Sequence, residues 1–134
     1  MDITLAVVAD AANRTESGKL NVLGIFQAIF TSAVPCRHPA LALVIGLEAS
    51  PTEAGQSIPI GITLIDEDGR LLMKFDPSDV AVPLAFQPLR HSTTLIINIG
   101  GAYFPRFGTY RFEVTANHST IGHVPLHVTH VLPT

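Results

Sequence analysis

The sequence predicts an all-β fold, a two-sheet antiparallel β-sandwich of eight or nine strands that forms a single domain over residues 1–134. Apolar residues recur at every second position, as in Leu41, Leu43, Ile45 and Leu47, which is typical of strands with one buried face. Turn residues separate these short apolar segments, and helix signals are nearly absent. Because each sheet needs its apolar face covered, a sandwich is favoured, with a small β-barrel as the alternative.

The expected strands follow one another along the whole chain. They lie near residues 3–9, 20–31, 40–49, 57–66, 70–75, 80–86, 93–100, 108–116 and 121–131. Residues that favour turns separate them, for example at 66–69 and 117–119. Pro125 has no N–H to donate to a neighbouring strand, so the last strand is expected at a sheet edge, at least at that position.

The segment 20–31 departs from regular alternation, because its apolar residues occupy both odd- and even-numbered positions. Two explanations remain open. The favoured one is a β-bulge at Gly24 that brings all of them into the core, and the other is a recognition surface outside the core. If a protein-binding patch exists, its candidate residues are Phe26, Phe30, Tyr103, Phe104 and Phe107.

The composition narrows the classes of partner. With 8 basic and 11 acidic residues the net charge is -3, which gives no basic footprint for nucleic acid. The longest apolar runs fall far short of the ~20 residues of a membrane helix, so no membrane span is expected. Only 14% of residues are charged and 47% are hydrophobic, which indicates a surface that faces another protein or a second copy of the chain.

The cysteine content indicates the compartment. Cys36 is the only cysteine, so no intramolecular disulfide can form. The start Met1-Asp2 lacks the basic residues of an export signal, and we expect a cytoplasmic protein.

Four histidines lie near the C-terminus, and histidine suits metal binding and proton transfer. On a strand, His123 and His127 would be about 13 Å apart, too far to share one metal ion. We expect His118, His123 and His127 to face solvent, and His130 to point inward at the end of the core.

The acidic residues of two neighbouring loops have a plain structural explanation that we favour. Asp66, Glu67 and Asp68 could bind calcium with Asp76 and Asp79, but 66–69 is also an ordinary hairpin turn. No EF-hand spacing is present, so turn formation is favoured.

Cys36 and His38 share one side of an extended chain, as a nucleophile and its base would. They lie in a connection between Pro35 and Pro39, and no oxyanion motif or acid accompanies them, so Cys36 is expected to be a small buried apolar group. The pair Gly100-Gly101 is not followed by a helix, which gives nucleotide binding no support. We expect no catalytic residues, no metal and no cofactor.

The segment 107–112 resembles the start of the F strand in immunoglobulin-like domains. That resemblance implies that Tyr110 forms a tyrosine corner and that Phe112 is buried. Over nearly its whole length the chain also resembles a family of small bacterial proteins of unknown function, common in actinobacteria, through residues 9–12, 18–26, 38–39, 66–69 and 108–114. This second resemblance implies a β-sandwich in a bacterial cytoplasm and no known activity.

Together these observations favour a non-enzymatic protein-interaction or structural module that binds another protein or itself. The alternative is a small-molecule or metal-binding sandwich that uses the histidine-rich C-terminal hairpin.

Overall fold

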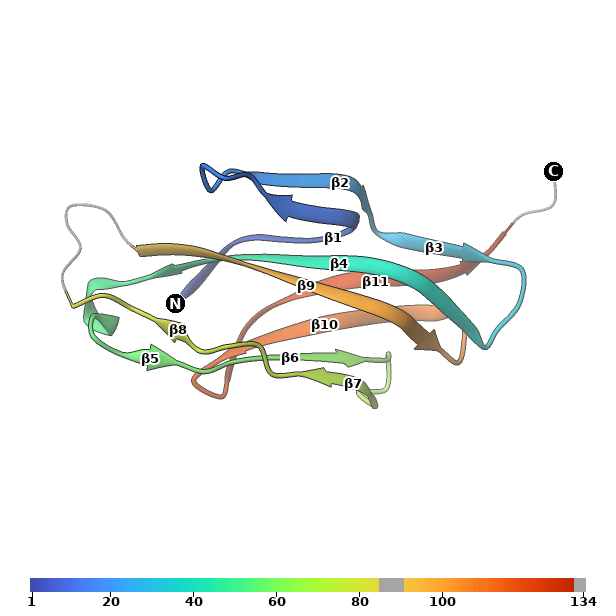
Figure 1. Cartoon of the computed structure of the whole chain (residues 1–134). Coiled ribbons are helices and arrows are strands. Elements are labelled where there is room, and N and C mark those ends of the chain that lie inside the picture. The colour runs from blue at the N-terminus through green and yellow to red at the C-terminus, as the bar shows by residue number, and fades with distance from the viewer. Residues whose placement is uncertain (85–90, 132–134) are drawn as a thin grey trace.

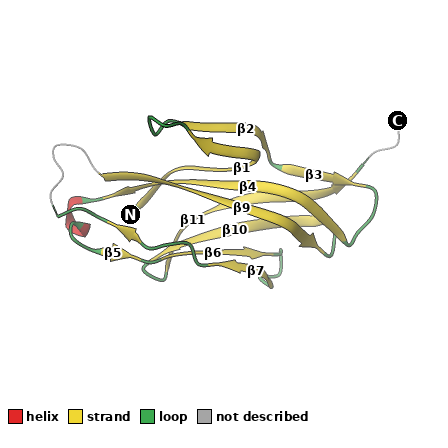
Figure 2. Ribbon diagram, in the orientation of Figure 1, coloured by secondary structure: helices red, strands yellow, loops and turns green. Residues whose placement is uncertain are grey.

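The computed structural model describes residues 1–84 and 91–131, and strands make up most of them. Figure 2 shows this strand content, with one short 3-10 helix, η1 (Pro51–Glu53). The strands are β1 (Asp2–Arg14), β2 (Leu20–Phe26), β3 (Ala28–Thr31), β4 (Cys36–Ala49), β5 (Ser57–Ile58), β6 (Ile60–Ile65), β7 (Leu71–Phe75), β8 (Val80–Ala81), β9 (His91–Phe104), β10 (Gly108–Ala116) and β11 (Ser119–His130).

The strands form two main sheets that lie one over the other (Figure 1). Sheet A has the strand order β2-β1-β4-β9, and sheet B has the order β3-β11-β10-β6-β7. A small third sheet pairs β5 with β8. Within the described ranges no strand belongs to both main sheets, so the predicted sandwich is confirmed and the barrel alternative is not.

The core lies between the two sheets. From sheet A, Leu41, Leu43, Ile45 and Leu47 point into it, as their alternation predicts. Sheet B contributes buried side chains from its three central strands, among them Ile62, Leu64, Phe112, Val114, Leu126 and Val128. Burial of this apolar area is the main stabilising contribution to the fold.

Several strands differ in length from the expectation. β1 runs to Arg14 instead of residue 9, because its second half continues as a hairpin with β2. The expected strand 57–66 divides into β5 and β6 at Pro59, which cannot donate to a neighbouring strand. Of the expected strand 80–86 the structure describes β8, and residues 85–86 lie outside the described part of the chain.

The bulge favoured at Gly24 is wrong. β2 pairs with β1 in one continuous register from Val8↔Phe26 to Arg14↔Leu20. The parity changes because the chain leaves sheet A after β2 and enters sheet B as β3. This crossing brings Ile29 into the core and leaves Ile25 and Phe30 exposed.

The last strand is an edge only in part. β3 pairs in parallel with His127–His130, so the end of β11 lies between two strands. Pro125 lies before that pairing and has Arg111 of β10 as its partner. Within the described residues no helix is long and apolar enough to cross a membrane.

Candidate binding surface

Tyr110 anchors the entry to β10. Its hydroxyl donates a hydrogen bond to the Arg106 carbonyl at 2.7 Å and accepts one from the Arg106 N–H at 3.1 Å. Burial raises the pKa of the Tyr110 phenol, and its ring packs edge-on against Phe104 at 5.0 Å. This is the predicted tyrosine corner, and Phe112 is buried as expected. With the two-sheet architecture, it confirms the immunoglobulin-like character of the sandwich.

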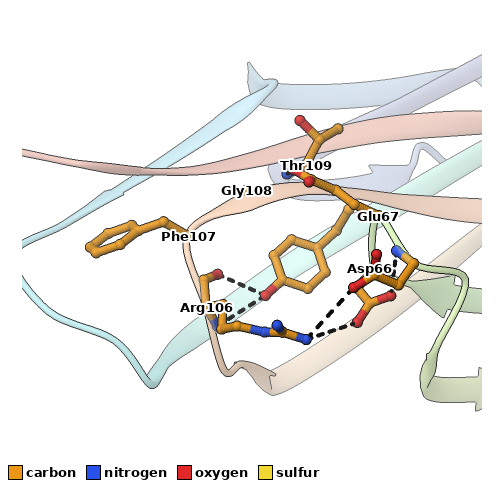
Figure 3. A pocket seen from close by; sticks show the side chains of 8 residues that line it. Asp66, Glu67, Arg106, Phe107, Gly108 and Thr109 are labelled. Atoms are coloured by element: carbon orange, nitrogen blue, oxygen red, sulfur yellow. Dashed lines mark hydrogen bonds and ion pairs between the residues drawn. The ribbon is translucent and has the colours of Figure 1, made fainter.

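The acidic turn 66–69 lies beside this corner, around a small cavity of about 80 Å³ (Figure 3). An Asp66 carboxylate oxygen accepts hydrogen bonds from the N–H groups of Asp68 and Arg70. Glu67 accepts one from Thr109 N–H at 2.6 Å, and Arg106 lies 3.7 Å from Asp66. These carboxylates therefore shape the turn and fasten it to the start of β10, as the turn interpretation predicts.

The calcium hypothesis gains no support from the arrangement of the acids. Asp76 lines a different depression, with Lys74 and His118, on the side of β6 where Gly61 lies. Across residues 1–84 and 91–131 no three His, Cys, Asp or Glu side chains are grouped closely enough to hold a metal ion.

The C-terminal histidines are spread along β11 and the turn before it. His118, His123 and His127 are exposed, as expected, and His127 Nδ1 lies 3.0 Å from the Thr109 hydroxyl. The expectation for His130 is wrong, because it is exposed, with its ring 5.6 Å from that of Phe107. The last side chain of β11 that enters the core is Val128, two residues before His130.

Cys36 and His38 lie on β4 and not in a connection, which corrects the sequence interpretation. The strand continues to Cys36 because β9 is long enough to pair with it, through Cys36↔Phe104 and His38↔Ala102. Cys36 is a partly buried side chain packed against the core, and the His38 ring lies 5.5 Å from Phe26.

The five aromatic candidates do not form one patch. Phe104 is 0% exposed and belongs to the core, so it cannot contact a partner, and its assignment to a binding patch is wrong. The backbone at Gly101, with φ 66, shifts the parity of β9 and turns Phe104 inward. Tyr103 packs under the Arg37 guanidinium at 5.0 Å, and Phe107 lies near His130.

Phe26 and Phe30 line one hollow beside exposed apolar side chains of β2 and β3. Leu23 is 63% exposed, Ile25 59% and Phe30 67%, whereas Phe26 is half-buried. The hollow beside them has a volume of about 410 Å³, and we call it the β2–β3 groove. It is lined by Asp10, Gly24, Ile25, Phe26, Ala28, Ile29, Phe30 and His38.

Asp10 supplies the negative charge of this groove, and the sequence analysis did not single it out. It lies on β1 opposite Gly24, and a Cβ at Gly24 would collide with its carboxylate. Gly24 also has φ 68, in the left-handed region that favours glycine. Among the described residues the Asp10 carboxylate makes no hydrogen bond or ion pair. An acid on β1 that faces a strand glycine was the signal that could have revealed it.

A search of curated proteins finds no match. Among solved structures, the crystal structure of an immunoglobulin-like protein from Pseudomonas aeruginosa is similar, with a TM-score of 0.44 and 14% identity over 95% of this chain and 94% of that chain. Residues 4–129 match the family of unknown function DUF6941, and the chain therefore belongs to that family.

Proposed function

We propose that this protein is a non-enzymatic interaction module whose β2–β3 groove binds an extended segment of another protein. The observation that carries the proposal is that the exposed side chains of Ile25 and Phe30 line a hollow of about 410 Å³, with exposed Leu23 two residues before Ile25 on β2. Isolated exposed apolar residues need no explanation, but a contiguous apolar patch next to a concavity is characteristic of a protein-binding site.

The open edge of β2 supports an extended occupant. β2 is the end strand of sheet A and pairs only with β1 among the described strands. A segment added to such an edge gains main-chain hydrogen bonds, while alternate side chains enter the neighbouring hollow. Ile25 and Phe30 would contact those side chains.

The charge of the groove specifies the chemistry of the segment further. Asp10 is a carboxylate without a protein partner in the described structure, at the wall of a hollow whose other lining residues are apolar apart from His38. A lysine or arginine of the bound segment would supply the missing positive charge. The proposed ligand is therefore an extended segment with alternating apolar residues and at least one basic residue.

We also propose a bacterial cytoplasmic setting, of the actinobacterial type that the sequence resemblance implies. The single cysteine supports it, because a domain of this size folds in a reducing compartment without disulfides. The alternative, metal or small-molecule binding by the C-terminal histidines, has less support, since His123 and His127 point from separate positions of one strand toward solvent.

Selection of displayed random peptides on the purified protein tests the proposal. Peptides selected on the wild type should carry alternating apolar residues and a lysine or arginine. They should lose binding to the Ile25→Asp/Phe30→Asp variant, and Asp10→Asn should weaken the basic peptides more than neutral ones. A matched variant on another edge strand, Leu71→Asp, should leave binding unchanged, because Leu71 is equally exposed but lies on β7. Peptides that bind all four proteins alike would contradict the groove assignment.

A further inference from the structure

The second edge of sheet A is formed by β9, the longest of the described edge strands. β9 spans His91–Phe104 and pairs with β4 in one unbroken register from Cys36↔Phe104 to Ala49↔His91. In the described structure β4 is the only strand that pairs with it. One side of this long strand therefore has no strand partner within the described residues.

Proteins usually protect such edges with charged side chains, proline, bulges or short strands. Residues 92–104 contain no Asp, Glu, Lys, Arg or Pro. The two edges of sheet B are protected in these ways: β7 carries Lys74, and β3 spans only Ala28–Thr31. The β2 edge also lacks charged residues and proline, but it spans only Leu20–Phe26, half the length of β9. β9 is the longest of the described edge strands, and residues 92–100 have none of these devices before Gly101, whose φ is 66.

The outer face of sheet A continues toward this edge as an apolar ladder. Val7 of β1, Val44 of β4 and Ile96 of β9 are successive partners on the face that points away from the core. Val44 in the middle is 0% exposed, whereas Ile96 at the edge is only half-buried. A further strand beside β9 would cover Ile96 as β1 and β9 cover Val44.

We propose that β9 pairs antiparallel with β9 of a second copy of this chain, joining the two A sheets into one continuous sheet across a two-fold axis. A two-fold pairing places each strand opposite itself, so any charge along it would risk facing its own copy, and like charges in cross-strand pairs are destabilising. Residues 92–104 carry no charged side chain, so every register of this pairing avoids that repulsion. The uncharged composition thus fits a copy of the same strand.

This proposal is independent of the β2–β3 groove, because β2 and β9 are the opposite edges of sheet A. Each can be disrupted without the other. A dimer formed through β9 would present two grooves, one at each end of the joined sheet.

The test is sedimentation velocity over a concentration series, with hydrogen exchange of the residues 92–104 amides at both extremes. The wild type should form a dimer, and its β9 amides should gain protection as the dimer forms. The variant Thr94→Lys/Asn98→Lys adds charge on the outward face of β9 and should weaken the dimer by about tenfold or more. The matched variant Ser17→Lys/Asn21→Lys adds the same charge near the opposite edge, at exposed positions, and should dimerise like the wild type.

Three results would overturn the proposal. The first is a wild type that stays monomeric at the highest attainable concentration. The second is a dimer that persists unchanged in Thr94→Lys/Asn98→Lys. The third is a dimer lost in Ile25→Asp/Phe30→Asp but kept in the β9 variant, which would assign self-association to the groove.

Discussion

The Tyr110 hydroxyl donates to the Arg106 carbonyl at 2.7 Å and accepts from the N–H of the same residue at 3.1 Å. Both hydrogen bonds close the short loop between β9 and β10 onto the core, where the Tyr110 ring is buried against Phe104. The same loop carries Arg106, which lies beside Asp66 of the acidic turn. One phenol group thus connects the position of the loop to the packing of the core.

We expect Tyr110→Phe to lower the free energy of unfolding by about 1–2 kcal/mol, because it removes both hydrogen bonds and leaves the ring in place. Tyr103→Phe is the control, since Tyr103 is 41% exposed and keeps its ring in this variant, and it should change stability by less than about 0.5 kcal/mol. Urea denaturation of the two variants provides the comparison. Equal stability losses would mean that the corner does not stabilise the fold as described.

The different burial of Phe104 on β9 and Phe30 on β3 leads to a second prediction, which separates core from surface aromatics. Phe104→Ala should cost about 3–5 kcal/mol, because Phe104 is fully buried and its truncation leaves a cavity. Phe30→Ala should cost less than about 0.5 kcal/mol, since its side chain is mostly exposed. Thermal or urea unfolding measures both, and a large cost at Phe30 would show that this side chain is structural and not available to a partner.

Gly24 should be sensitive to substitution for two separable reasons, its backbone conformation and its contact with Asp10. Gly24→Ala should cost more than Gly69→Ala, because Gly69 has a similar φ of 79 but no atom within 4 Å of the added Cβ. The backbone contribution common to both is about 1–2 kcal/mol.

A double-mutant cycle isolates the contribution of the carboxylate. In an Asp10→Ala background, the cost of Gly24→Ala should fall toward that of Gly69→Ala. If Gly24→Ala lowers the free energy of unfolding equally in the wild-type and Asp10→Ala backgrounds, the close approach of Asp10 to Gly24 does not affect stability.

Glu53 should make the stability of the protein depend on acid pH. Burial alone would raise its pKa, but the Met1 amine, 2.8 Å away, and the Ser50 N–H and hydroxyl outweigh burial and lower the pKa from the ordinary 4.5. A carboxyl with a lowered folded-state pKa adds stability that is complete above its unfolded value and is lost as pH falls through the folded value.

Glu53→Gln should therefore reduce stability by about 1–2 kcal/mol at neutral pH and change it little in strong acid. Chemical denaturation from neutral pH to below 4.5 measures the difference between the two proteins. A difference that stays constant with pH would contradict the ion pair.

The sequence predicted the sandwich because local alternation in segments such as 41–47 and 108–116 records which face is buried. The tyrosine corner was also predictable, since 107–112 contains its sequence pattern. The path of segment 20–31 was not, because a bulge and a crossing between sheets both place apolar residues on two parities. Phe104 was misassigned for a related reason: the left-handed backbone at Gly101 reverses the parity of the residues that follow.

The β2–β3 groove was predictable only in part. Phe26 and Phe30 stood out as aromatic residues in an irregular strand, but Asp10 and His38 come from β1 and β4, and only the pairing of strands brings them together. The exposed edge of β9 depends on strand order, which local patterns do not encode.

The most direct test of the central claim is site-specific photo-crosslinking in the cells of the native host, with a photoreactive phenylalanine analogue in place of Phe30 and, as the control, of Leu71. We expect one abundant adduct with a single protein from position 30, its loss when Ile25 is also changed to Asp, and none from position 71. An equal yield from both positions, or no adduct from position 30, would contradict the assignment of the β2–β3 groove as a protein-binding surface.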